Sequence, residues 1–538
     1  MNNQFRILIF SILLFFFLSS CKDKKAVDKR ITEELPIFNE KPNIVYILAD
    51  DLGYGELGCY GQTKIHTPNI DALAKNGMKF TQHYSGSPVC APSRYSLLTG
   101  LHTGHGYIRG NDEWKERGDV WNYEMAVNNS NLEGQLPIPD STYTLGKMLH
   151  SAGYKTALVG KWGLGAPNTG GVATKQGFDF FYGYNCQRQA HNLYPKHLWK
   201  NEKKVWLNNE LVPPHSRLEE GVNPNKNESY ARFSQKEYAP ALMLDEALEF
   251  MTRNKENPFF LYFASPLTHV PLQAPKEYVD RYRKEFGEEA PYTGGDNYFP
   301  NQYPRATYAA MVTCLDNQVG QLVSQLKALK LYENTLIIFS SDNGPTFNGG
   351  SNSIFFDSAM PFSSEKGKGK CFVYEGGIRV PMIASWPGKI DPSTVNDHIS
   401  AQWDIMSTLA EVVSIKNEKI EAIDGISFLP SLLGKEQQKE HEYLYWEFSS
   451  YGGQQAVRKG NWKAVRQQID DGNLVVELYD LSKDNETKNV ADQYPEIVKE
   501  IETILKEAHL EAVNDRFKFE KFGEMKSQKQ TNIKGEIK

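Results

Sequence analysis

The protein has 538 residues, and its 60 lysines and arginines against 66 aspartates and glutamates leave a formal net charge of -6. A chain of this length buries a large core and suits one large domain with a smaller companion. Its mildly acidic balance, without a basic tail or face, argues against a nucleic-acid-binding protein. Its six cysteines are scattered without a Cys-x-x-Cys pair, which excludes the common zinc and redox motifs.

The N-terminus has the pattern of an export signal. Arg6 precedes an apolar run from Ile7 to Leu18, which is too short to span a membrane comfortably and fits the core of a signal peptide. The following Leu-Ser-Ser-Cys21 resembles a bacterial lipobox, which implies cleavage before Cys21 and lipidation of its thiol. We therefore expect a signal peptide over 1–20, a solvated tether over 21–40, and an exported lipoprotein anchored to a membrane in the periplasm or at the outer cell surface. Ordinary secretion with an incidental cysteine is the alternative.

Short apolar runs then alternate with amphipathic segments along most of the chain. This alternation predicts an α/β fold with a mostly parallel central sheet covered by helices, in which ligands bind at the carboxyl ends of the strands. Thr67 and Pro68 are a suitable cap and first residue for the first helix. We expect strands over 42–51, 78–84, 155–159, 258–264 and 334–341, and helices over 67–77, 142–152, 238–254 and 308–329.

Three long segments lack a clear period and are expected to be substrate-facing loops: 109–139, 165–230 and 274–304. After Gly434 the pattern changes to strands over 442–448, 455–466 and 474–481 and a helix over 495–512, which indicates a small α+β subdomain with an antiparallel sheet. The expected domains are therefore a catalytic domain over 41–434, a C-terminal subdomain over 435–515 and a frayed polar tail over 516–538.

Residues 87–100, SPVCAPSRYSLLTG, carry the strongest chemical signal. Ser93 can cap an apolar-patterned helix, which would place Cys90 at a helix N-terminus, where free amides and the helix dipole hold anions. Arg94 adds a guanidinium suited to a tetrahedral oxyanion. The pattern indicates a nucleophile or modified residue facing a sulfate or phosphate. A buried structural cysteine and an unmodified thiolate nucleophile are the alternatives.

The run from Cys90 to Arg94, with the Leu-Leu-Thr-Gly that follows, resembles the Cys-x-Pro-Ser-Arg signature of the formylglycine-dependent type I sulfatases, an arylsulfatase-like family of the alkaline phosphatase superfamily. The resemblance covers roughly residues 40 to 510 and leans toward bacterial members that act on polysaccharides. It implies an alkaline-phosphatase-like fold, conversion of Cys90 to formylglycine (3-oxoalanine) by a formylglycine-generating enzyme, and calcium-dependent hydrolysis of a sulfate ester on a carbohydrate.

Two acidic pairs end two of the expected strands. Asp50 and Asp51 with Asp342 and Asn343 form an all-oxygen donor set, which suits Ca2+ or Mg2+ better than zinc or copper. The resemblance implies that all four residues are ligands of a single calcium ion. It also implies Arg94 and Lys161 as cations beside the formylglycine, Lys370 as a sulfate-binding residue in place of Lys366 or Lys368, and His269, in THVP, near the leaving group.

The chain departs from the family at one motif. Members of the family usually have the sequence Gly-Lys-Trp-His-Leu-Gly at this motif, and the histidine is expected to act as a base during sulfate release. This chain has Gly163 at the position of that histidine. His105 and His191 are candidate replacements for that base. Sugar recognition is expected from Arg and Asn side chains that bond hydroxyls and from Trp faces that stack on a pyranose. The candidates are Arg109, Asn111, Trp114, Gln187, His191 and Trp199.

The leading interpretation is a sulfatase that removes sulfate from a glycan, with a weak preference for galactose-type sugars. A phosphodiesterase or phosphonate hydrolase of the same superfamily is the nearest enzymatic alternative. A surface glycan-binding protein whose catalysis has lapsed is a second alternative, prompted by Gly163.

Overall fold

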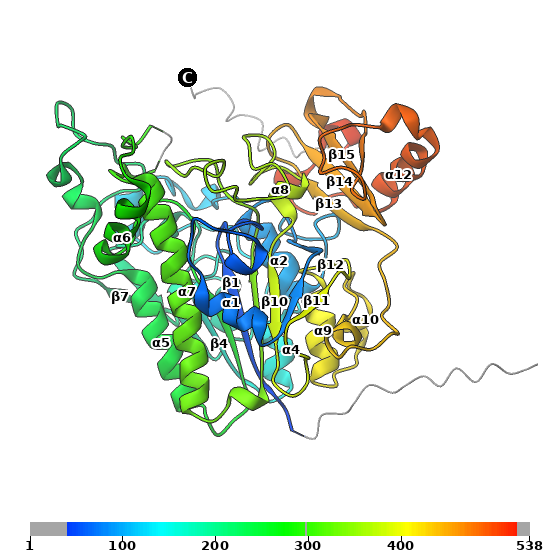
Figure 1. Cartoon of the computed structure of the whole chain (residues 1–538), viewed down its shortest axis with the longest axis horizontal. Coiled ribbons are helices and arrows are strands. Elements are labelled where there is room, and N and C mark those ends of the chain that lie inside the picture. The colour runs from blue at the N-terminus through cyan, green and yellow to red at the C-terminus, as the bar shows by residue number, and fades with distance from the viewer. Residues whose placement is uncertain (1–39, 296–297, 525–538) are drawn as a thin grey trace, which may run out of the picture. The chain divides into compact units, whose positions relative to one another are not determined.

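The computed structural model describes residues 40–295 and 298–524. Its main feature is a ten-stranded sheet, drawn with its covering helices in Figure 1. Across the sheet the strands run in the order β11 (Thr394–Asn396), β2 (Met78–Phe80), β10 (Met382–Ser385), β9 (Thr335–Ser341), β1 (Asn43–Ala49), β8 (Phe259–Ala264), β4 (Lys155–Lys161), β5 (Phe180–Tyr184), β6 (His197–Lys200) and β7 (Lys203–Trp206).

The centre of the sheet is parallel. β9, β1, β8, β4 and β5 all pair in parallel, with Ile47 of β1 opposite Phe339 on one side and Phe263 on the other. Every residue of β1, β8 and β9 is buried, because helices cover both faces of such a sheet, and this explains their continuous apolar sequences. The predicted α/β fold with a mostly parallel sheet is confirmed.

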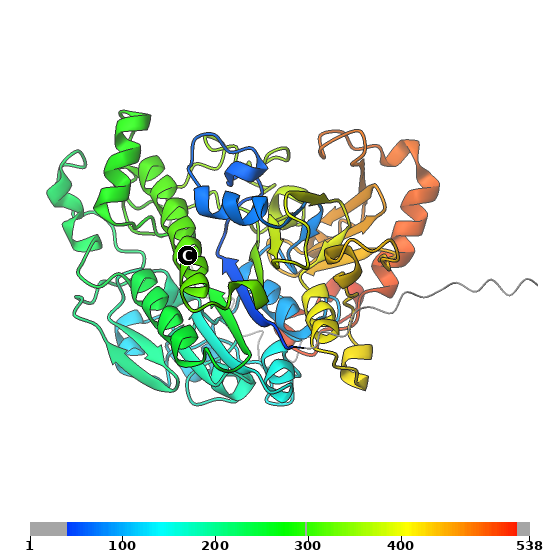
Figure 2. The same ribbon diagram turned by 60° about the horizontal axis from the view of Figure 1, so that its bottom comes forward.

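Helices pack on this sheet in two groups, which Figure 2 shows from a second direction. Val45 and Ile47 of β1 share a core with α1 (Pro68–Lys75), α5 (Ala239–Arg253) and α7 (Pro304–Ala328), and α6 (Lys276–Phe286) packs on α7. Tyr46 points to the other face, where its ring lies 6.0 Å from that of Tyr262. The second group contains α2 (Cys90–Thr99), α4 (Leu145–Ser151) and α9 (Asp404–Val412), and α4 contacts β4.

The C-terminal region forms a separate antiparallel sheet, coloured orange in Figure 1. It consists of β13 (Leu444–Phe448), β14 (Gln454–Lys459), β15 (Trp462–Gln467) and β16 (Glu477–Asp480). Helix α12 (Pro495–Glu507) buries its apolar stripe, including Ile501 and Leu505, against this sheet. The short helices are α3 (Tyr123–Asn128), α8 (Glu375–Ile378), α10 (Glu418–Glu421) and α11 (Leu429–Leu432), and β3 (His83–Tyr84) pairs with β12 (Ser400–Ala401).

Several expectations were wrong in detail. The segment 455–466 is a hairpin and not one strand, because the chain reverses at Gly460, whose φ of +52° favours glycine. The expected loops over 165–230 and 274–304 contain β5, β6, β7 and α6, and the segment 109–139 contains α3. The strand expected over 78–84 is split between two sheets as β2 and β3.

The expected polar tail is partly packed, because Phe517 and Phe519 are buried in its first residues. None of the helices in the described part of the chain combines the length and the apolar character needed to cross a bilayer. The predicted signal peptide, the tether before Glu40 and the predicted lipidation site Cys21 lie outside the described residues.

Candidate active site

Helix α2 begins at Cys90, as the motif predicted, and its side chains are buried throughout. The residue before it, Val89, is extended and occupies the N-cap position. Ser93 is therefore not the cap; it lies inside the first turn, where its hydroxyl donates to Gln402 Oε1 at 2.5 Å. The amide of Ala91 donates to Asn111 Oδ1 at 2.8 Å, so Asn111 holds the start of the helix that carries the cysteine.

The two acidic pairs meet at one edge of the sheet. β1 and β9 are parallel neighbours with Ala49 opposite Ser341, so the residues that follow them emerge side by side. The Asp51 amide donates to Asp342 Oδ1 at 3.1 Å, and Asn343 Nδ2 donates to Asp51 Oδ1 at 2.8 Å. The carboxyl ends of parallel strands thus gather the four predicted metal ligands into one buried cluster.

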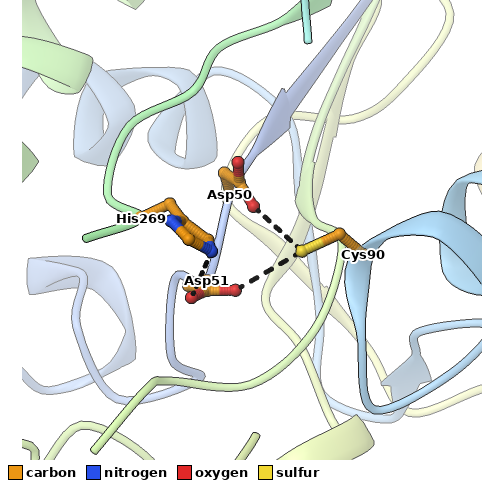
Figure 3. A group of neighbouring side chains, drawn as sticks. All are labelled: Asp50, Asp51, Cys90 and His269. Atoms are coloured by element: carbon orange, nitrogen blue, oxygen red, sulfur yellow. Dashed lines mark hydrogen bonds and ion pairs between the residues drawn. The ribbon is translucent and has the colours of Figure 1, made fainter. Parts of the chain in front are cut away.

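Cys90 points into this cluster, as Figure 3 shows. Its Sγ lies 3.4 Å from Asp50 Oδ1 and 3.9 Å from Asp51 Oδ1. His269 enters from the segment after β8, where Asp50 exchanges two backbone hydrogen bonds with Leu267 and Thr268. Its Nε2 lies 3.7 Å from Asp51 Oδ2.

Cations surround the thiol. Lys161 Nζ lies 2.6 Å from Asp50 Oδ2 and 3.5 Å from Cys90 Sγ. Lys370 Nζ lies 2.6 Å from both oxygens of Asp51 and 3.6 Å from the same sulfur. Arg94 Nε and NH2 both donate to Asp342 Oδ2, at 3.0 and 2.8 Å. Each of the carboxylates therefore has a buried cationic partner.

The sequence also offered Lys366 and Lys368 near Lys370. Lys366 is exposed, and Lys368 Nζ lies 3.4 Å from the centre of the Tyr374 ring. Lys370 itself is fixed by its backbone, because its amide donates to Pro345 O and the next amide donates to Pro88 O. The structure thus brings Lys370, and neither of the other two lysines, to the thiol.

The electrostatics of the cluster separate its acidic groups. Burial opposes ionisation of Asp50, but Lys161, His269 and Arg94 outweigh it and hold the pKa of Asp50 well below its usual range. Burial, together with the charge of Asp50, raises the pKa of Asp342 to about 6. Burial also raises the pKa of the Cys90 thiol well above its ordinary value, in spite of Lys161 and Lys370.

The residues fit a hard divalent cation. Asn343 Oδ1 is buried and has no hydrogen-bond donor within the described parts of the chain, although its amide nitrogen is bonded. An amide oxygen left unpaired beside three carboxylates is a ligand that Ca2+ or Mg2+ accepts. Asp50, Asp51 and Cys90 with His269 form one group whose ligand atoms lie within 4.8 Å of one another.

Loop residues far apart in sequence close the site. The rings of His191 and His269 are stacked with centroids 5.0 Å apart, and Tyr298 contacts both, at 5.3 and 6.1 Å. His215 lies 6.0 Å from Tyr298. Burial and the neighbouring His269 lower the pKa of His191 well below 6.5, so its ring is neutral near pH 7. The sequence analysis named His191 but missed His215 and Tyr298, which stand in segments without a motif.

The second candidate base belongs to a different cluster. His105 Nδ1 lies 2.8 Å from Asp424 Oδ1, and its ring lies 4.1 Å from that of His102. The amide of Gly104 donates to His102 Nδ1 at 3.1 Å, so the proton of that ring is on Nε2, which faces Asp424. A metal at Nε2 would need the proton on Nδ1, where the Gly104 amide opposes it, and so we assign no ion to this group.

Two of the expected sugar-binding residues are structural. Arg109 is buried, and its NH1 lies 2.5 Å from Glu447 Oε1 and 2.7 Å from the carbonyl of Leu510, so it joins the loop after α2 to the C-terminal region. The Trp199 indole donates to the buried Glu133 at 2.7 Å. These contacts occupy both side chains, and the substrate-binding role of the two residues stays a prediction. Trp114 is half-buried, with the Arg117 guanidinium 5.3 Å from the centre of its ring.

Comparisons with known proteins show the family of the chain. A family model described as Sulfatase matches residues 42–415, and one described as N-sulphoglucosamine sulphohydrolase, C-terminal, matches residues 367–512. An N-acetylgalactosamine-6-O-sulfatase of Bacteroides thetaiotaomicron is 31% identical over 518 residues, covering 87% of this chain and 93% of that protein. An N-acetylgalactosamine-6-sulfatase of Canis lupus familiaris is 32% identical over 435 residues, covering 79% and 72%. The crystal structure of Ps i-CgsB is 28% identical with a TM-score of 0.66, covering 86% of this chain and 92% of that one.

A buried cysteine among cations, at the carboxyl edge of a parallel sheet, suits a hydrolase that holds a tetrahedral oxyanion. The family match over most of the chain identifies the kind: the protein belongs to the sulfatase family, within the alkaline phosphatase superfamily, and is a sulfuric ester hydrolase. The resemblance drawn from the Cys90 motif is thereby confirmed.

Proposed function

We propose that the protein hydrolyses a sulfate ester on a carbohydrate, with Cys90 converted to formylglycine by a formylglycine-generating enzyme and with one bound calcium ion. The observation that carries this proposal is the surroundings of Cys90 Sγ, which has Lys161 Nζ at 3.5 Å and Lys370 Nζ at 3.6 Å. Two ammonium groups within 3.6 Å of one buried atom are suited to the oxygens of an anionic ester.

The donor set of the site supports the calcium ion and the formylglycine of this proposal. A calcium ion held by Asp50, Asp51, Asp342 and Asn343, with an aldehyde hydrate at position 90, would supply a Lewis acid and a nucleophile. Lys161 and Lys370 bind the anionic oxygens of the ester, and Arg94 holds Asp342 ionised and in place through two hydrogen bonds to one oxygen.

His269 is placed to hold a proton for the leaving oxygen. His269 Nδ1 is hydrogen-bonded to the carbonyl of Val270, which can only accept, so Nδ1 carries a proton. Nε2 faces Asp51. Burial and the two lysines lower the pKa of His269 when no anion is bound. The negative charge of a bound sulfate ester acts in the opposite direction and favours the protonated ring.

The proposed substrate is a 6-O-sulfated galactose-type sugar, with or without an acetamido group. Two relatives support this proposal, because the bacterial and the mammalian protein named above are N-acetylgalactosamine-6-sulfatases. A further solved structure is described as Ps i-CgsB in complex with k-i-k-neocarrahexaose, and it is 28% identical with a TM-score of 0.65. We also propose that the mature protein is exported and anchored to a membrane through lipidated Cys21.

The first test is the mass of the tryptic peptide Phe80 to Arg94 from protein made in its native host. Formylglycine formation should remove the thiol mass and leave an aldehyde, and an intact cysteine in fully mature, active protein would contradict the mechanism. The second test measures turnover of 6-O-sulfated N-acetylgalactosamine by the parent protein, with the Cys90→Ala variant as the control. Faster turnover of 4-nitrophenyl phosphate than of 4-nitrophenyl sulfate would favour a phosphoester hydrolase. Glycan binding without turnover in the parent protein would favour a lapsed enzyme.

A further inference from the structure

A buried carboxamide without partners lies beside the site. Gln187 is 6% exposed, yet neither its Oε1 nor its Nε2 has a hydrogen-bond partner in the described part of the protein. Its backbone is fixed, because its amide donates to Gln135 Oε1 at 3.0 Å. A carboxamide offers two donor hydrogens and an acceptor oxygen, and burying them unpaired is costly. Such a group is kept where a ligand or water completes it.

The amide of Gln187 fills the space that a side chain at position 163 would need. A Cβ on Gly163 would lie 2.3 Å from Gln187 Nε2 and 3.0 Å from its carboxamide carbon. Gly163 also has a φ of +78°, which favours glycine. Its amide donates to the carbonyl of Asn185 at 3.0 Å, so the two segments are held together. The glycine is therefore the steric complement of Gln187.

Gln187 lies between two parts of the site already described. On one side, Gly163 comes two residues after Lys161, whose Nζ contacts Cys90 Sγ. On the other side, one 3-10 turn, Arg188–Ala190, separates Gln187 from His191, whose ring stacks on His269. The same loop therefore contacts Gly163, two residues from the lysine beside the thiol, and carries the histidine that stacks on His269.

Other polar atoms of this loop are also unpaired. His191 Nδ1 and Asn185 Oδ1 are buried without partners among the described residues. The side-chain amides of Gln187 and Asn185 carry no charge. Arg188 of the same turn is charged and its Nε is also unpaired, but its NH1 donates to the Val120 carbonyl at 2.9 Å and its guanidinium lies over the Trp121 ring. Lys161 and Lys370 supply the positive charge for the sulfate, and so the uncharged amides of Gln187 and Asn185 are left for the uncharged part of the substrate.

We propose that Gln187 is a specificity-determining residue that binds a neutral donor and acceptor group of the sulfated sugar, either a hydroxyl or an acetamido group. The carboxamide can pair with an acetamido group through two reciprocal N–H to O=C bonds, or with a hydroxyl through one bond in each direction. This inference rests on the proposed function, because it assigns the sugar contact of the same site.

A double-mutant cycle tests the packing of Gln187 against Gly163 in the absence of substrate. Gly163→Ala, Gln187→Ala and the double variant are compared by thermal unfolding midpoint. Gly163→Ala should lower the midpoint more in the parent chain than in the Gln187→Ala background, because only the backbone strain remains there. Equal losses in both backgrounds would show that the amide does not occupy this space and would overturn the inference.

Kinetics test the sugar contact. Gln187→Met keeps the volume but removes the hydrogen bonds, and Gln189→Ala is the matched control, a buried glutamine of the same turn whose amide atoms are not among the unpaired ones. With 6-O-sulfated N-acetylgalactosamine and 6-O-sulfated galactose as probes, Gln187→Met should lower kcat/KM about 10- to 100-fold, mainly through KM. A larger loss with the acetamido sugar identifies that group as the partner, and equal losses identify a hydroxyl.

The inhibition constant of inorganic sulfate separates sugar binding from sulfate binding. It should stay the same in Gln187→Met, since the lysines hold the sulfate. A parallel loss of sulfate inhibition, or kinetics equal to those of Gln189→Ala, would overturn the inference while leaving the sulfatase assignment intact. Absence of turnover of both sugars by the parent enzyme would instead refute the proposed substrate class, and the sugar contact with it.

Discussion

Replacing Arg109 by methionine should destabilise the protein without weakening substrate binding. The Arg109 guanidinium lies 2.5 Å from Glu447 Oε1 and also donates to the carbonyls of Gly106 and Leu510, at 2.8 and 2.7 Å. Both charged side chains are almost fully buried, with 3% and 1% exposure. The substitution leaves a buried carboxylate without its arginine, which costs about 3–5 kcal/mol.

The lower end of that range is expected, because Glu447 keeps two partners. The Tyr445 hydroxyl and His509 Nδ1 each lie 2.7 Å from Glu447 Oε2. The assay is the urea midpoint of unfolding for Arg109→Met, Glu447→Gln and the double variant, together with KM for the sulfated sugar. The double variant should lose less than the sum of the single losses, because the second change removes the stranded charge.

The result that would refute this reasoning is an unchanged unfolding midpoint with a KM raised tenfold or more. That outcome would return Arg109 to the substrate site, where the sequence analysis had put it. A loss of stability with KM unchanged would establish the arginine as a link between the loop after α2 and the C-terminal region.

Other predictions concern the site and its surroundings. Lys370→Ala should lower kcat/KM about 100- to 1000-fold, and the exposed Lys366→Ala should not; equal effects would contradict the sulfate-binding role. Dialysis against EDTA should abolish turnover, and Ca2+ should restore it; full activity without metal would exclude the calcium role. Burial raises the pKa of Glu113 to about 8 from 4.5. Between these two pH values the folded protein keeps a proton on Glu113 that the unfolded chain loses. The contribution of Glu113 to the free energy of unfolding is therefore complete below pH 4.5 and falls toward pH 8, by up to about 1.4 kcal/mol per pH unit. Glu113→Gln should flatten that slope in urea midpoints measured at pH 5 and 8, and an unchanged slope would contradict the raised pKa.

The sequence by itself determined the parallel core and the place of the chemistry. β1, β8 and β9 are continuous apolar runs because both faces are covered, and such runs can be recognised locally. Residues that follow strands of one direction emerge at one edge, so the sequence placed both Asp-containing pairs at that edge. The resemblance to the sulfatases predicted that they share one ion, and the pairing of β1 with β9 brings them together. The Cys90 motif is also local, and the sequence placed the cysteine at a helix N-terminus, although the N-cap is Val89 and not the expected Ser93.

Local patterns failed where packing decides the structure. The hairpin β14–β15 reads as one strand, because the turn at Gly460 interrupts an otherwise regular pattern. β6 and β7 lie at the edge of the sheet, and β7 is half-exposed or exposed throughout, so no buried face marked it. Each of these elements depends on neighbours that its own residues do not specify.

The tertiary structure alone decided which buried polar residues are paired within the protein. Arg109 and Gln187 were both candidates for sugar binding, and nothing local to either of them separates the two. Arg109 meets Glu447, 338 residues away, and is paired with it. Gln187 meets the bare backbone of Gly163, and its amide finds no partner among the described residues. The difference is physical: whether a buried polar group has a partner depends on the side chains that the fold brings to it, and those come from distant parts of the chain.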